Sequence, residues 1–247
     1  MINTVLCQDS TDLDNIPDES IHLVATSPPY NVGKAYDDDL NLGEYLTMLD
    51  TVFAETYRTL VDGGRVCINI ANVGRKPYVP YHKFVIDSML SNGFQMRGEI
   101  IWSKGAGAGS STAWGSWKSA TNPVLRDTHE YILVFSKGRY GRRDRGEDTI
   151  TTAEFLTYTK SVWTFAPERA KRVRHPAPFP VELPYRCIQL YTFKGDTVLD
   201  PFGGSGTVAI ASMMTGRNYI LVDRDKEYVS IARDRVREYE QTQNQKL

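Results

Sequence analysis

Short apolar runs alternate with amphipathic segments along most of this chain of 247 residues. The run 21–26 is apolar and of strand length, and a Pro-Pro pair follows it closely. Residues 43–60 instead place apolar side chains at helical spacing, and the residues on that face are Leu46, Leu49, Phe53, Tyr57 and Leu60. We expect Asp62-Gly63-Gly64 to stop this helix, because glycine readily takes positive φ. The alternation of the two periods is typical of an α/β protein.

The same pattern continues to the end of the chain. Further strands are predicted at 4–6, 66–70, 94–102, 131–135, 197–199 and 219–222. Further helices are predicted at about 182–191 and 207–215, and a last helix begins near Asp225, a residue type that commonly caps helices. If this last helix leads back to the strand at 4–6, Asp9 and Asp223 follow adjacent strands. Both would then lie at the edge of the sheet where ligands bind.

Two stretches interrupt the pattern. Residues 103–128 are rich in Gly, Ser and Thr and contain Trp114 and Trp117, which argues for a functional loop rather than simple disorder. Residues 138–174 are basic, with Arg139, Arg142, Arg143, Arg145, Lys160, Arg169, Lys171, Arg172 and Arg174. A local basic stretch suits a nucleic-acid backbone. A solvated surface loop is the equal alternative for this feature taken alone.

Composition narrows the class of protein. The length fits one domain over 1–247, and the formal net charge is −1. The apolar runs are too short for a transmembrane helix, and residues 1–20 do not resemble a secretion signal. Cys7, Cys67 and Cys187 have no metal-ligand spacing with the four histidines. We therefore expect a cytoplasmic, reduced protein without a metal.

The first candidate motif is Asp200-Pro201-Phe202-Gly203-Gly204-Ser205-Gly206-Thr207, between a predicted strand and a predicted helix. Glycines there let the backbone turn tightly and approach a ligand, and the helix N-terminus offers free N–H donors. Asp223, at the end of the next strand, is placed to accept the two hydroxyls of a ribose. Residues 204–209 also fit the dinucleotide pattern G-x-G-x-x-A, so a nicotinamide oxidoreductase is an alternative, as is a turn used only for packing.

The second candidate motif is Ser27-Pro28-Pro29-Tyr30, just after the strand at 21–26. The Pro-Pro pair stiffens the chain and removes two N–H donors, which leaves carbonyls as acceptors. Ser27 adds a hydroxyl and Tyr30 an aromatic face. Two acceptors and a stacking surface suit the exocyclic amine of a nucleobase. As an isolated string, such a turn more often only ends a strand and has no binding role.

Together the two motifs resemble those of the DNA amino-methyltransferases, in the permuted group whose catalytic tetrapeptide precedes the cofactor loop. The resemblance covers nearly the whole chain. It implies a Rossmann-like, circularly permuted methyltransferase fold of the α/β class, with a mixed sheet of about seven strands and helices on both faces. It also implies S-adenosyl-L-methionine as cofactor, double-stranded DNA as partner, and a target-recognition segment within 138–174.

The resemblance assigns roles to individual residues. The catalytic positions are Ser27, Pro28, Pro29 and Tyr30. The cofactor-binding positions are Asp9, Ala177, Phe179, Asp200, Phe202, Gly203, Gly204, Ser205, Gly206, Thr207 and Asp223. The DNA-binding positions are Arg139, Arg142, Arg143, Arg145, Lys171 and Arg172. Gln8 departs from the family pattern, in which a glycine precedes the residue matching Asp9.

Within this family, a serine before Pro-Pro goes mostly with N4-cytosine enzymes, which makes cytosine N4 the expected target and adenine N6 the alternative. Methylation of RNA or of a protein amide, and a nucleic-acid-binding module with an inactive cofactor fold, are further alternatives. The intact motifs argue against the inactive module. The sequence leaves open whether the protein forms a homodimer and whether a cognate restriction endonuclease accompanies it.

Overall fold

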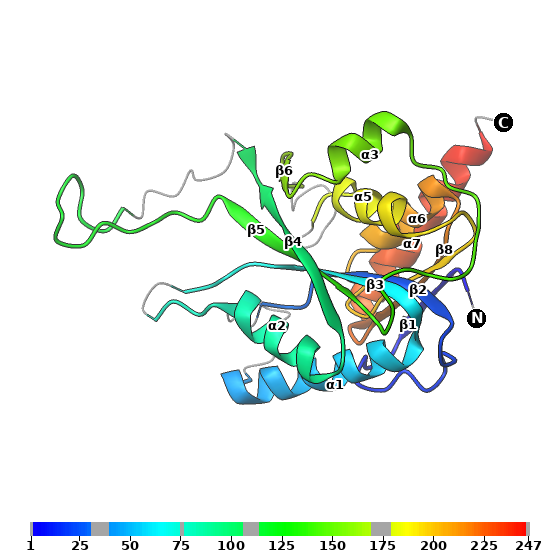
Figure 1. The fold of residues 1–247 in the computed structure, drawn as a ribbon, viewed down its shortest axis with the longest axis horizontal. Coiled ribbons are helices and arrows are strands. Elements are labelled where there is room, and N and C mark those ends of the chain that lie inside the picture. Colours follow the sequence, from blue (N-terminus) through cyan, green and yellow to red (C-terminus); the bar gives the residue numbers. More distant parts are fainter. Residues whose placement is uncertain (1, 31–39, 75–76, 106–113, 169–178, 246–247) are drawn as a thin grey trace.

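The computed structural model describes residues 2–30, 40–74, 77–105, 114–168 and 179–245. These residues form one mixed sheet of eight strands, ordered β1-β8-β7-β2-β3-β5-β4-β6 (Figure 1). The strands are β1 (Thr4–Cys7), β2 (Ile21–Thr26), β3 (Leu60–Ile70), β4 (Gln95–Ser103), β5 (His129–Ser136), β6 (Val162–Thr164), β7 (Thr197–Asp200) and β8 (Asn218–Asp223).

Strand direction determines which segments share an edge of the sheet. Strands β1, β8, β7, β2 and β3 pair in parallel, so their carboxyl ends lie at one edge. Strand β5 is antiparallel to both β3 and β4, and its amino end lies at that same edge. Strand β6 runs parallel to β4 and ends there too. We call this the motif edge, because both sequence motifs follow strands that end on it.

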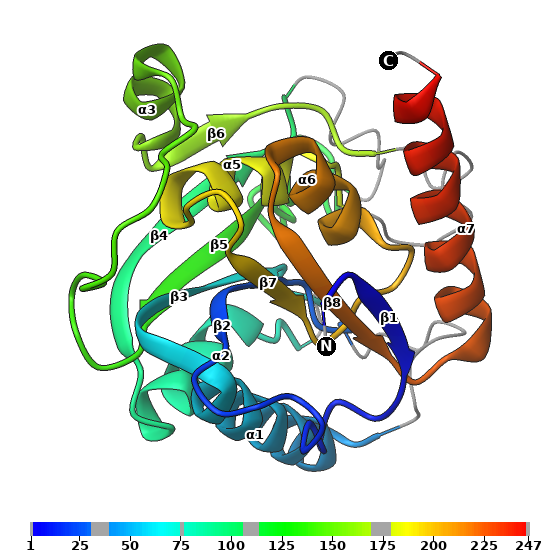
Figure 2. The ribbon, with the colours of Figure 1, turned by 90° about the vertical axis from the view of Figure 1, so that its right-hand side faces the viewer.

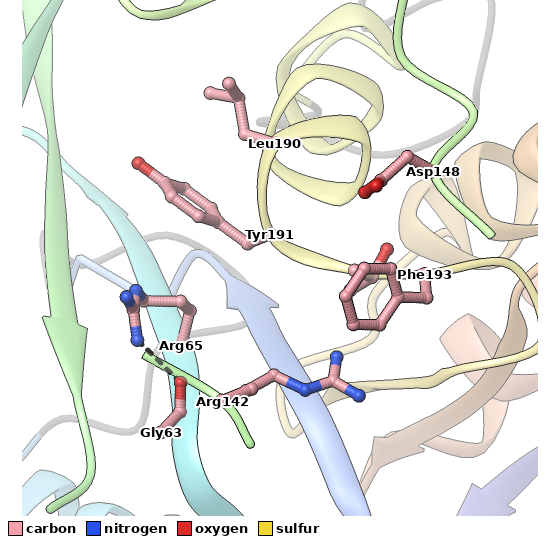
Figure 3. Close-up of a pocket in the computed structure, with 8 residues that line it drawn as sticks. Gly63, Arg65, Arg142, Asp148, Leu190, Tyr191 and Phe193 are labelled. Atoms are coloured by element: carbon pink, nitrogen blue, oxygen red, sulfur yellow. Dashed lines mark hydrogen bonds between the residues drawn. The ribbon is translucent and has the colours of Figure 1, made fainter. Parts of the chain in front are cut away.

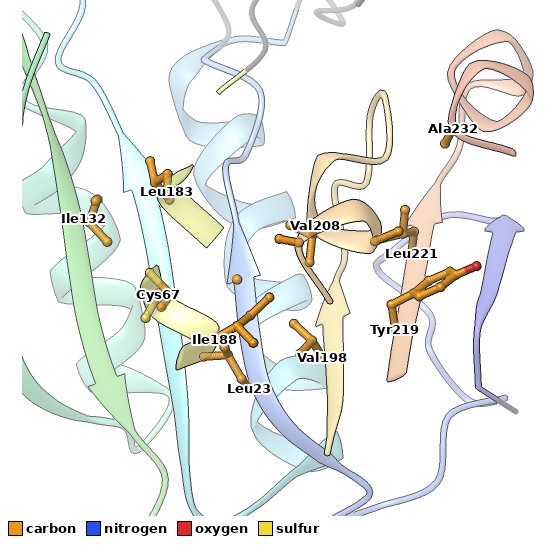
Figure 4. Packing of buried hydrophobic residues seen from close by; sticks show 14 of the residues in the cluster. Leu23, Cys67, Ile132, Leu183, Ile188, Val198, Val208, Tyr219, Leu221 and Ala232 are labelled. Carbon is orange, nitrogen blue, oxygen red and sulfur yellow. The ribbon is translucent and has the colours of Figure 1, made fainter. Parts of the chain in front are cut away.

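Helices cover both faces of the sheet (Figure 2). The helices α1 (Leu42–Thr59) and α2 (Tyr81–Ser91) pack on one face, where they enclose an apolar cluster that includes Leu49, Phe53 and Val85. The other face carries α5 (Glu182–Tyr191), α6 (Thr207–Thr215) and α7 (Lys226–Asn244), with α3 (Thr152–Tyr158) beside α5. Its cluster joins the sheet to these helices through Ile188, Val208 and Ala232 (Figure 4).

The main helices agree with the sequence prediction because their signals are local. Helix α7 begins after Asp225, whose side chain accepts hydrogen bonds from the backbone N–H groups of Glu227 and Tyr228. The short helices α2 and α3 were not predicted. The sheet has eight described strands rather than about seven, because the three-residue β6 carries no strand pattern of its own. Trp163 in β6 is nevertheless fully buried in the core.

The expected helix stop at Asp62-Gly63-Gly64 is wrong. Helix α1 ends at Thr59, and Leu60 already has extended backbone angles and begins β3. Gly63 does have a positive φ of 82°, but for a different reason. A Cβ atom there would lie 2.8 Å from the Gly141 carbonyl oxygen, so glycine lets a distant loop pack closely against the strand.

In the part of the chain that the structure describes, no helix has the length and apolar character needed to cross a membrane.

Candidate active site

The two sequence motifs meet where β2 and β7 pair, through Val24 and Leu199. Thr26 ends β2 and Asp200 ends β7, and the Thr26 hydroxyl donates a 2.6 Å hydrogen bond to Asp200 Oδ1. Helix α1 leaves β2 on one face and α6 leaves β7 on the other, so this junction is the point where the chain connections diverge. Such a point in an open α/β sheet is the usual place for a ligand crevice.

The glycines of the first motif have different structural roles. A Cβ on Gly203 would lie 2.9 Å from Leu221 Cβ, so this position serves close packing on β8. Gly206 has φ of 82° and lies against Ala232 of α7, also at packing distance. Gly204 has φ of 46°, and its N–H donates to Asp223 Oδ2 over 2.8 Å. Helix α6 then begins without a side-chain cap, which leaves backbone N–H groups at its N-terminus available to an anion.

The rest of the motif is anchored from both sides. The Phe202 N–H donates to Asp200 Oδ1 over 3.1 Å, and the half-buried Phe202 side chain packs against the core. Ser205 and Thr207 are buried, and Arg235 of α7 donates to the Ser205 hydroxyl over 2.9 Å. Burial raises the pKa of Asp200 to about 7. The loop is therefore held by Asp200 at its start and by Arg235 of α7 from outside.

The two carboxylates predicted to follow adjacent strands do so. Cys7 of β1 pairs with Asp223 of β8, and Asp9 lies two residues beyond Cys7. Burial raises the pKa of Asp223, while hydrogen bonds from backbone N–H groups, including that of Gly204, oppose this. Asp9 is exposed and accepts from the Thr11 N–H over 2.9 Å, which forms a local turn. This agrees with the predicted arrangement, in which both carboxylates lie at the motif edge.

The Pro-Pro turn presents a specific set of acceptors. Tyr45 of α1 donates to the Pro29 carbonyl over 2.6 Å, so that oxygen already has a partner. Among the described residues, no hydrogen bond reaches the Pro28 carbonyl. Ser27 Oγ lies 3.3 Å from Tyr30 Oη. The acceptors left at this turn are therefore the Ser27 hydroxyl and the Pro28 carbonyl.

Three residues missed by the sequence analysis complete the turn. The Tyr30 hydroxyl donates to Glu130 Oε2 over 3.1 Å, and Asn69 Nδ2 donates to the same carboxylate oxygen over 2.7 Å. Lys104 forms an ion pair with the other carboxylate oxygen of Glu130. Burial raises the pKa of Tyr30 well above its ordinary value, and the Glu130 charge adds to this effect. Asn69 had one available signal, since it is polar within the otherwise apolar run 66–70.

The structure places the described arginines of the predicted DNA-binding set away from the motif edge. They are Arg139, Arg142, Arg143 and Arg145. Gly63, at the beginning of β3, bonds to Lys137 and packs on Gly141, so the segment that follows β5 lies at the opposite edge. Arg139 pairs with Asp62 there. The Arg142 side chain is 9% exposed and forms ion pairs with Asp196 and Asp144, so it has no exposed face for phosphate. These ion pairs inside the fold do not favour a DNA contact for Arg142.

Arg143 and Arg145 are exposed but belong to this same far segment. Strand β3 separates this segment from the motif edge by the five residue steps from Arg65 to Ile70, or about 17 Å at strand rise. This distance does not favour a DNA contact for these two arginines near the motif edge. Lys171, Arg172 and Ala177 lie outside the described residues. Phe179 is half-buried and packs against the core cluster that contains α5.

Other polar groups gather at the edge of the sheet opposite the motif edge, which we call the far edge. His22, Asp144 and Asp196 place one ligand atom each within 4.8 Å of one another, and burial lowers the pKa of His22. The Arg142 guanidinium pairs with both carboxylates and so offsets part of their negative charge. A cavity of about 190 Å³ opens beside it, between Arg65 and Phe193 (Figure 3). Neither sequence motif lines this cavity.

A projecting arm leaves the motif edge between β4 and β5. Its described part, residues 114–128, extends well beyond the sheet (Figure 1). The arm is internally bonded, since the Val124 N–H donates to the Trp114 carbonyl over 3.0 Å. Trp114 and Trp117 pack edge to face with ring centroids 5.2 Å apart, yet Trp117 remains 64% exposed. Lys118 lies 5.6 Å from the centroid of the Trp117 ring. The arm thus presents aromatic and cationic groups to solvent.

Comparison with known proteins agrees with this geometry. Residues 21–234 match a family model named for N6 and N4 methyltransferases and described as DNA methylase. The chain is 32% identical to the type II methyltransferase M.MthZI of Methanothermobacter thermautotrophicus, with 94% of this chain and 75% of that protein covered. It is 31% identical to M.MjaI of Methanocaldococcus jannaschii, with 94% and 90% covered.

Solved structures show the same fold. The Thermus thermophilus protein TTHA0409, solved in complex with S-adenosyl-L-methionine, superposes with a TM-score of 0.77 at 28% identity, covering 95% of this chain and 93% of that one. The cytosine-N4-specific PvuII DNA methyltransferase shares the fold, with a TM-score of 0.76 at 22% identity and coverage of 94% and 85%. Since the family model and the relatives span most of its length, the chain belongs to the DNA methylase family of N6 and N4 amino-methyltransferases.

Proposed function

We propose that this protein is a site-specific DNA methyltransferase that transfers a methyl group from S-adenosyl-L-methionine to N4 of cytosine. The observation that carries the proposal is the junction of β2 and β7, where Thr26 and Asp200 join the two motifs by a hydrogen bond. A cofactor bound along the glycine loop would then present its methyl group beside the Pro-Pro turn. The relatives M.MthZI and M.MjaI are named type II methyltransferases, which supports a role in a restriction-modification pair.

The residues present fit the cofactor. Asp223 is a carboxylate at a strand end and is suited to accept from ribose hydroxyls. It also accepts from the N–H of Gly204, which has a positive φ, and so helps to fix the glycine loop. Asp9 follows the adjacent strand and would face the adenine end. The uncapped N-terminus of α6 would face polar groups of the ligand. When bound, S-adenosyl-L-methionine supplies an electrophilic methyl group and needs no metal to activate it.

The chain's own residues would activate the amine. Its lone pair is delocalised into the base, which makes the amine a poor nucleophile. Ser27 Oγ and the Pro28 carbonyl would accept the two amine hydrogens and favour a pyramidal nitrogen. Positioning of amine and methyl carbon at roughly 3–3.5 Å in line would supply most of the remaining acceleration. A base must leave the duplex to reach this geometry, at about a few kcal/mol, and stacking on Tyr30 would offset part of that cost.

Ser27 is the reason for choosing cytosine N4. Among the DNA amino-methyltransferases that the motifs resemble, a serine before Pro-Pro goes mostly with N4-cytosine enzymes. Adenine N6 is the second candidate. Incubation with unmethylated genomic DNA and labelled cofactor, followed by nucleoside mass spectrometry, separates the two. We expect N4-methylcytosine, and N6-methyladenine alone would overturn the cytosine assignment.

Parallel incubations test whether the substrate is DNA, RNA or protein. The same incubation with RNA and with protein should give no labelled product if duplex DNA is the substrate. Ser27→Ala should lose at least about tenfold in transfer rate, because one acceptor of the amine is removed. Ser91→Ala, at an exposed serine that ends α2, is the matched control and should keep the wild-type rate. Label in RNA or protein but not in DNA would contradict the proposal.

A further inference from the structure

We propose that Ser27, Tyr30 and Glu130 form a proton relay, through which Glu130 takes up the proton that the target amine loses on methylation. The proposal rests on the proposed function and adds to its site Glu130, which belongs to neither motif. Its basis is a continuous hydrogen-bonded chain that runs from the Pro-Pro turn after β2 to the amino end of β5.

The distances define the order of the chain. Ser27 Oγ lies 3.3 Å from Tyr30 Oη, and Tyr30 Oη lies 3.1 Å from Glu130 Oε2. Asn69 Nδ2 braces the chain, at 2.7 Å from Glu130 Oε2 and 3.1 Å from Tyr30 Oη. Glu130 is only 8% exposed, so these contacts are shielded from bulk water. Low local polarity strengthens each of them.

A count of protons fixes the direction of every bond. Tyr30 has one hydroxyl proton, and it is donated to Glu130. The Asn69 amide nitrogen can only donate to Tyr30. Ser27 must therefore be the donor in its contact with Tyr30. One lone pair of Ser27 Oγ faces Asn69 Nδ2 at 3.5 Å, and the other is left for the substrate. This arrangement makes Ser27 Oγ an acceptor for an amine hydrogen before any substrate binds.

The reaction releases one proton, and the chain accounts for it. The amine lone pair forms the bond to the methyl carbon, and the electron pair of the broken C–S bond stays on sulfur. The nitrogen then carries a positive charge and is a strong acid, since loss of a proton returns its lone pair to the ring. Its proton passes to Ser27 Oγ, the Ser27 proton to Tyr30 Oη, and the Tyr30 proton to Glu130 Oε2. The sulfonium charge and the carboxylate charge are both neutralised.

The surroundings of Glu130 suit a group that accepts a proton and later releases it to solvent. The charged and titratable groups that contact its carboxylate, among the described residues, are Lys104 beyond β4 and Tyr30 beyond β2. Lys104 holds the carboxylate in place through the oxygen that Tyr30 does not contact. The Lys104 side chain is 26% exposed, so the pair borders solvent and can release the proton between turnovers. Asn69 is neutral and keeps the two acceptor atoms together.

The first test is the pH dependence of single-turnover methylation by the full-length protein on duplex DNA. Glu130→Gln keeps the shape and a hydrogen-bond acceptor but cannot take up the proton. We expect the rate to fall about 10²–10⁴-fold, the usual range for proton transfer by a positioned group, with cofactor affinity unchanged. The decline of the wild-type rate toward acid pH should disappear in the variant. A slower variant whose pH profile is parallel to wild type would overturn the relay in favour of a structural role.

The second test asks whether the residues act as one unit. Tyr30→Phe keeps the ring but breaks the chain in its middle. If the relay exists, the double variant Tyr30→Phe/Glu130→Gln should be no slower than the slower single variant, because one broken link already stops transfer. Additive losses would mean that the two residues act independently, and would overturn the proposal. Absence of transfer by the wild-type protein would instead overturn the proposed function, and the relay with it.

The third test needs neither DNA nor cofactor. Carbon-13 NMR of ring-labelled tyrosine reports on the hydroxyl, and the Tyr30 signal is assigned by its loss in Tyr30→Phe. Glu130→Gln should shift that signal, because the bond partner of the hydroxyl changes from a charged to a neutral group. Glu99→Gln, at an exposed position of β4, is the matched control and should leave it in place. An unmoved Tyr30 signal in Glu130→Gln would overturn the relay even if the enzyme is active.

Discussion

Thr26 and Asp200, 174 residues apart in sequence, are joined by a 2.6 Å hydrogen bond at the ends of two adjacent strands. The bond ties the segment that carries the Pro-Pro turn to the segment that carries the glycine loop. Asp200 is fully buried, and its Oδ1 also accepts from the Phe202 N–H. Any shift of one motif relative to the other would strain the bond between Thr26 and Asp200.

Asp200→Asn should flatten the dependence of stability on pH. Burial raises the pKa of Asp200 from its ordinary value of 3.8 to about 7. A carboxyl with a raised folded-state pKa holds its proton more tightly when folded, so stability falls as pH rises from about 4 to about 7 and is then constant. Asparagine accepts the same two hydrogen bonds and does not titrate. Chemical denaturation at several pH values measures the slope, and equal slopes for the variant and wild type would contradict the expected titration.

Asp223→Ala should weaken S-adenosyl-L-methionine binding about 10- to 100-fold, as loss of hydrogen bonds to a charged acceptor predicts. The Asp223 carboxylate also holds the Gly204 N–H, so part of this loss would come from the loop itself. Asp223→Asn keeps one acceptor for Gly204 and should lose less. Isothermal titration calorimetry gives both affinities. If both variants bind S-adenosyl-L-methionine with the wild-type affinity, Asp223 is not part of the cofactor site.

Arg142→Ala should destabilise the fold by about 3 kcal/mol, because it leaves the Asp196 carboxylate buried without its partner. Arg143→Ala is the neighbouring control and should change stability by less than about 0.5 kcal/mol, since its side chain is exposed. Urea denaturation compares the two. A loss for Arg142→Ala no larger than for the control would mean that the ion pair is not important for stability.

Lys118→Ala should lower DNA affinity and reduce the slope of log affinity against log salt by about one, as removal of one phosphate contact predicts. This lysine lies on the arm at the motif edge. The double variant Arg143→Ala/Arg145→Ala removes two charges from the opposite edge and should leave the slope unchanged. Fluorescence anisotropy over a salt series measures both. A slope that is lowered in the double variant and unchanged in Lys118→Ala would mean that DNA binds at the far edge.

The arm itself should become protected when DNA binds. Residues 114–128 carry exposed aromatic side chains and project beyond the sheet, as expected for a flap that closes over a substrate. Hydrogen exchange measured with and without duplex DNA tests this. Exchange that is slow and identical in both states would exclude a flap.

The sequence by itself determined the class of fold and the two motifs. Helical and strand periodicities are local, so α5 and α6 could be predicted within a residue of their ends. The prediction that Asp9 and Asp223 follow adjacent strands is confirmed by the pairing of Cys7 with Asp223. It succeeded because parallel strands joined by helices leave few alternatives for the chain path.

Only the tertiary structure decided which charges and polar groups serve the site. Nothing local distinguishes Arg142, which is paired inside the fold, from Arg143, which faces solvent. Glu130 and Lys104 likewise look like ordinary surface charges until the fold brings Glu130 beside Tyr30 and Lys104 beside Glu130. Periodicity reports the burial of a face, whereas an ion pair depends on which distant strand ends meet, and that is decided by the packing of the whole sheet.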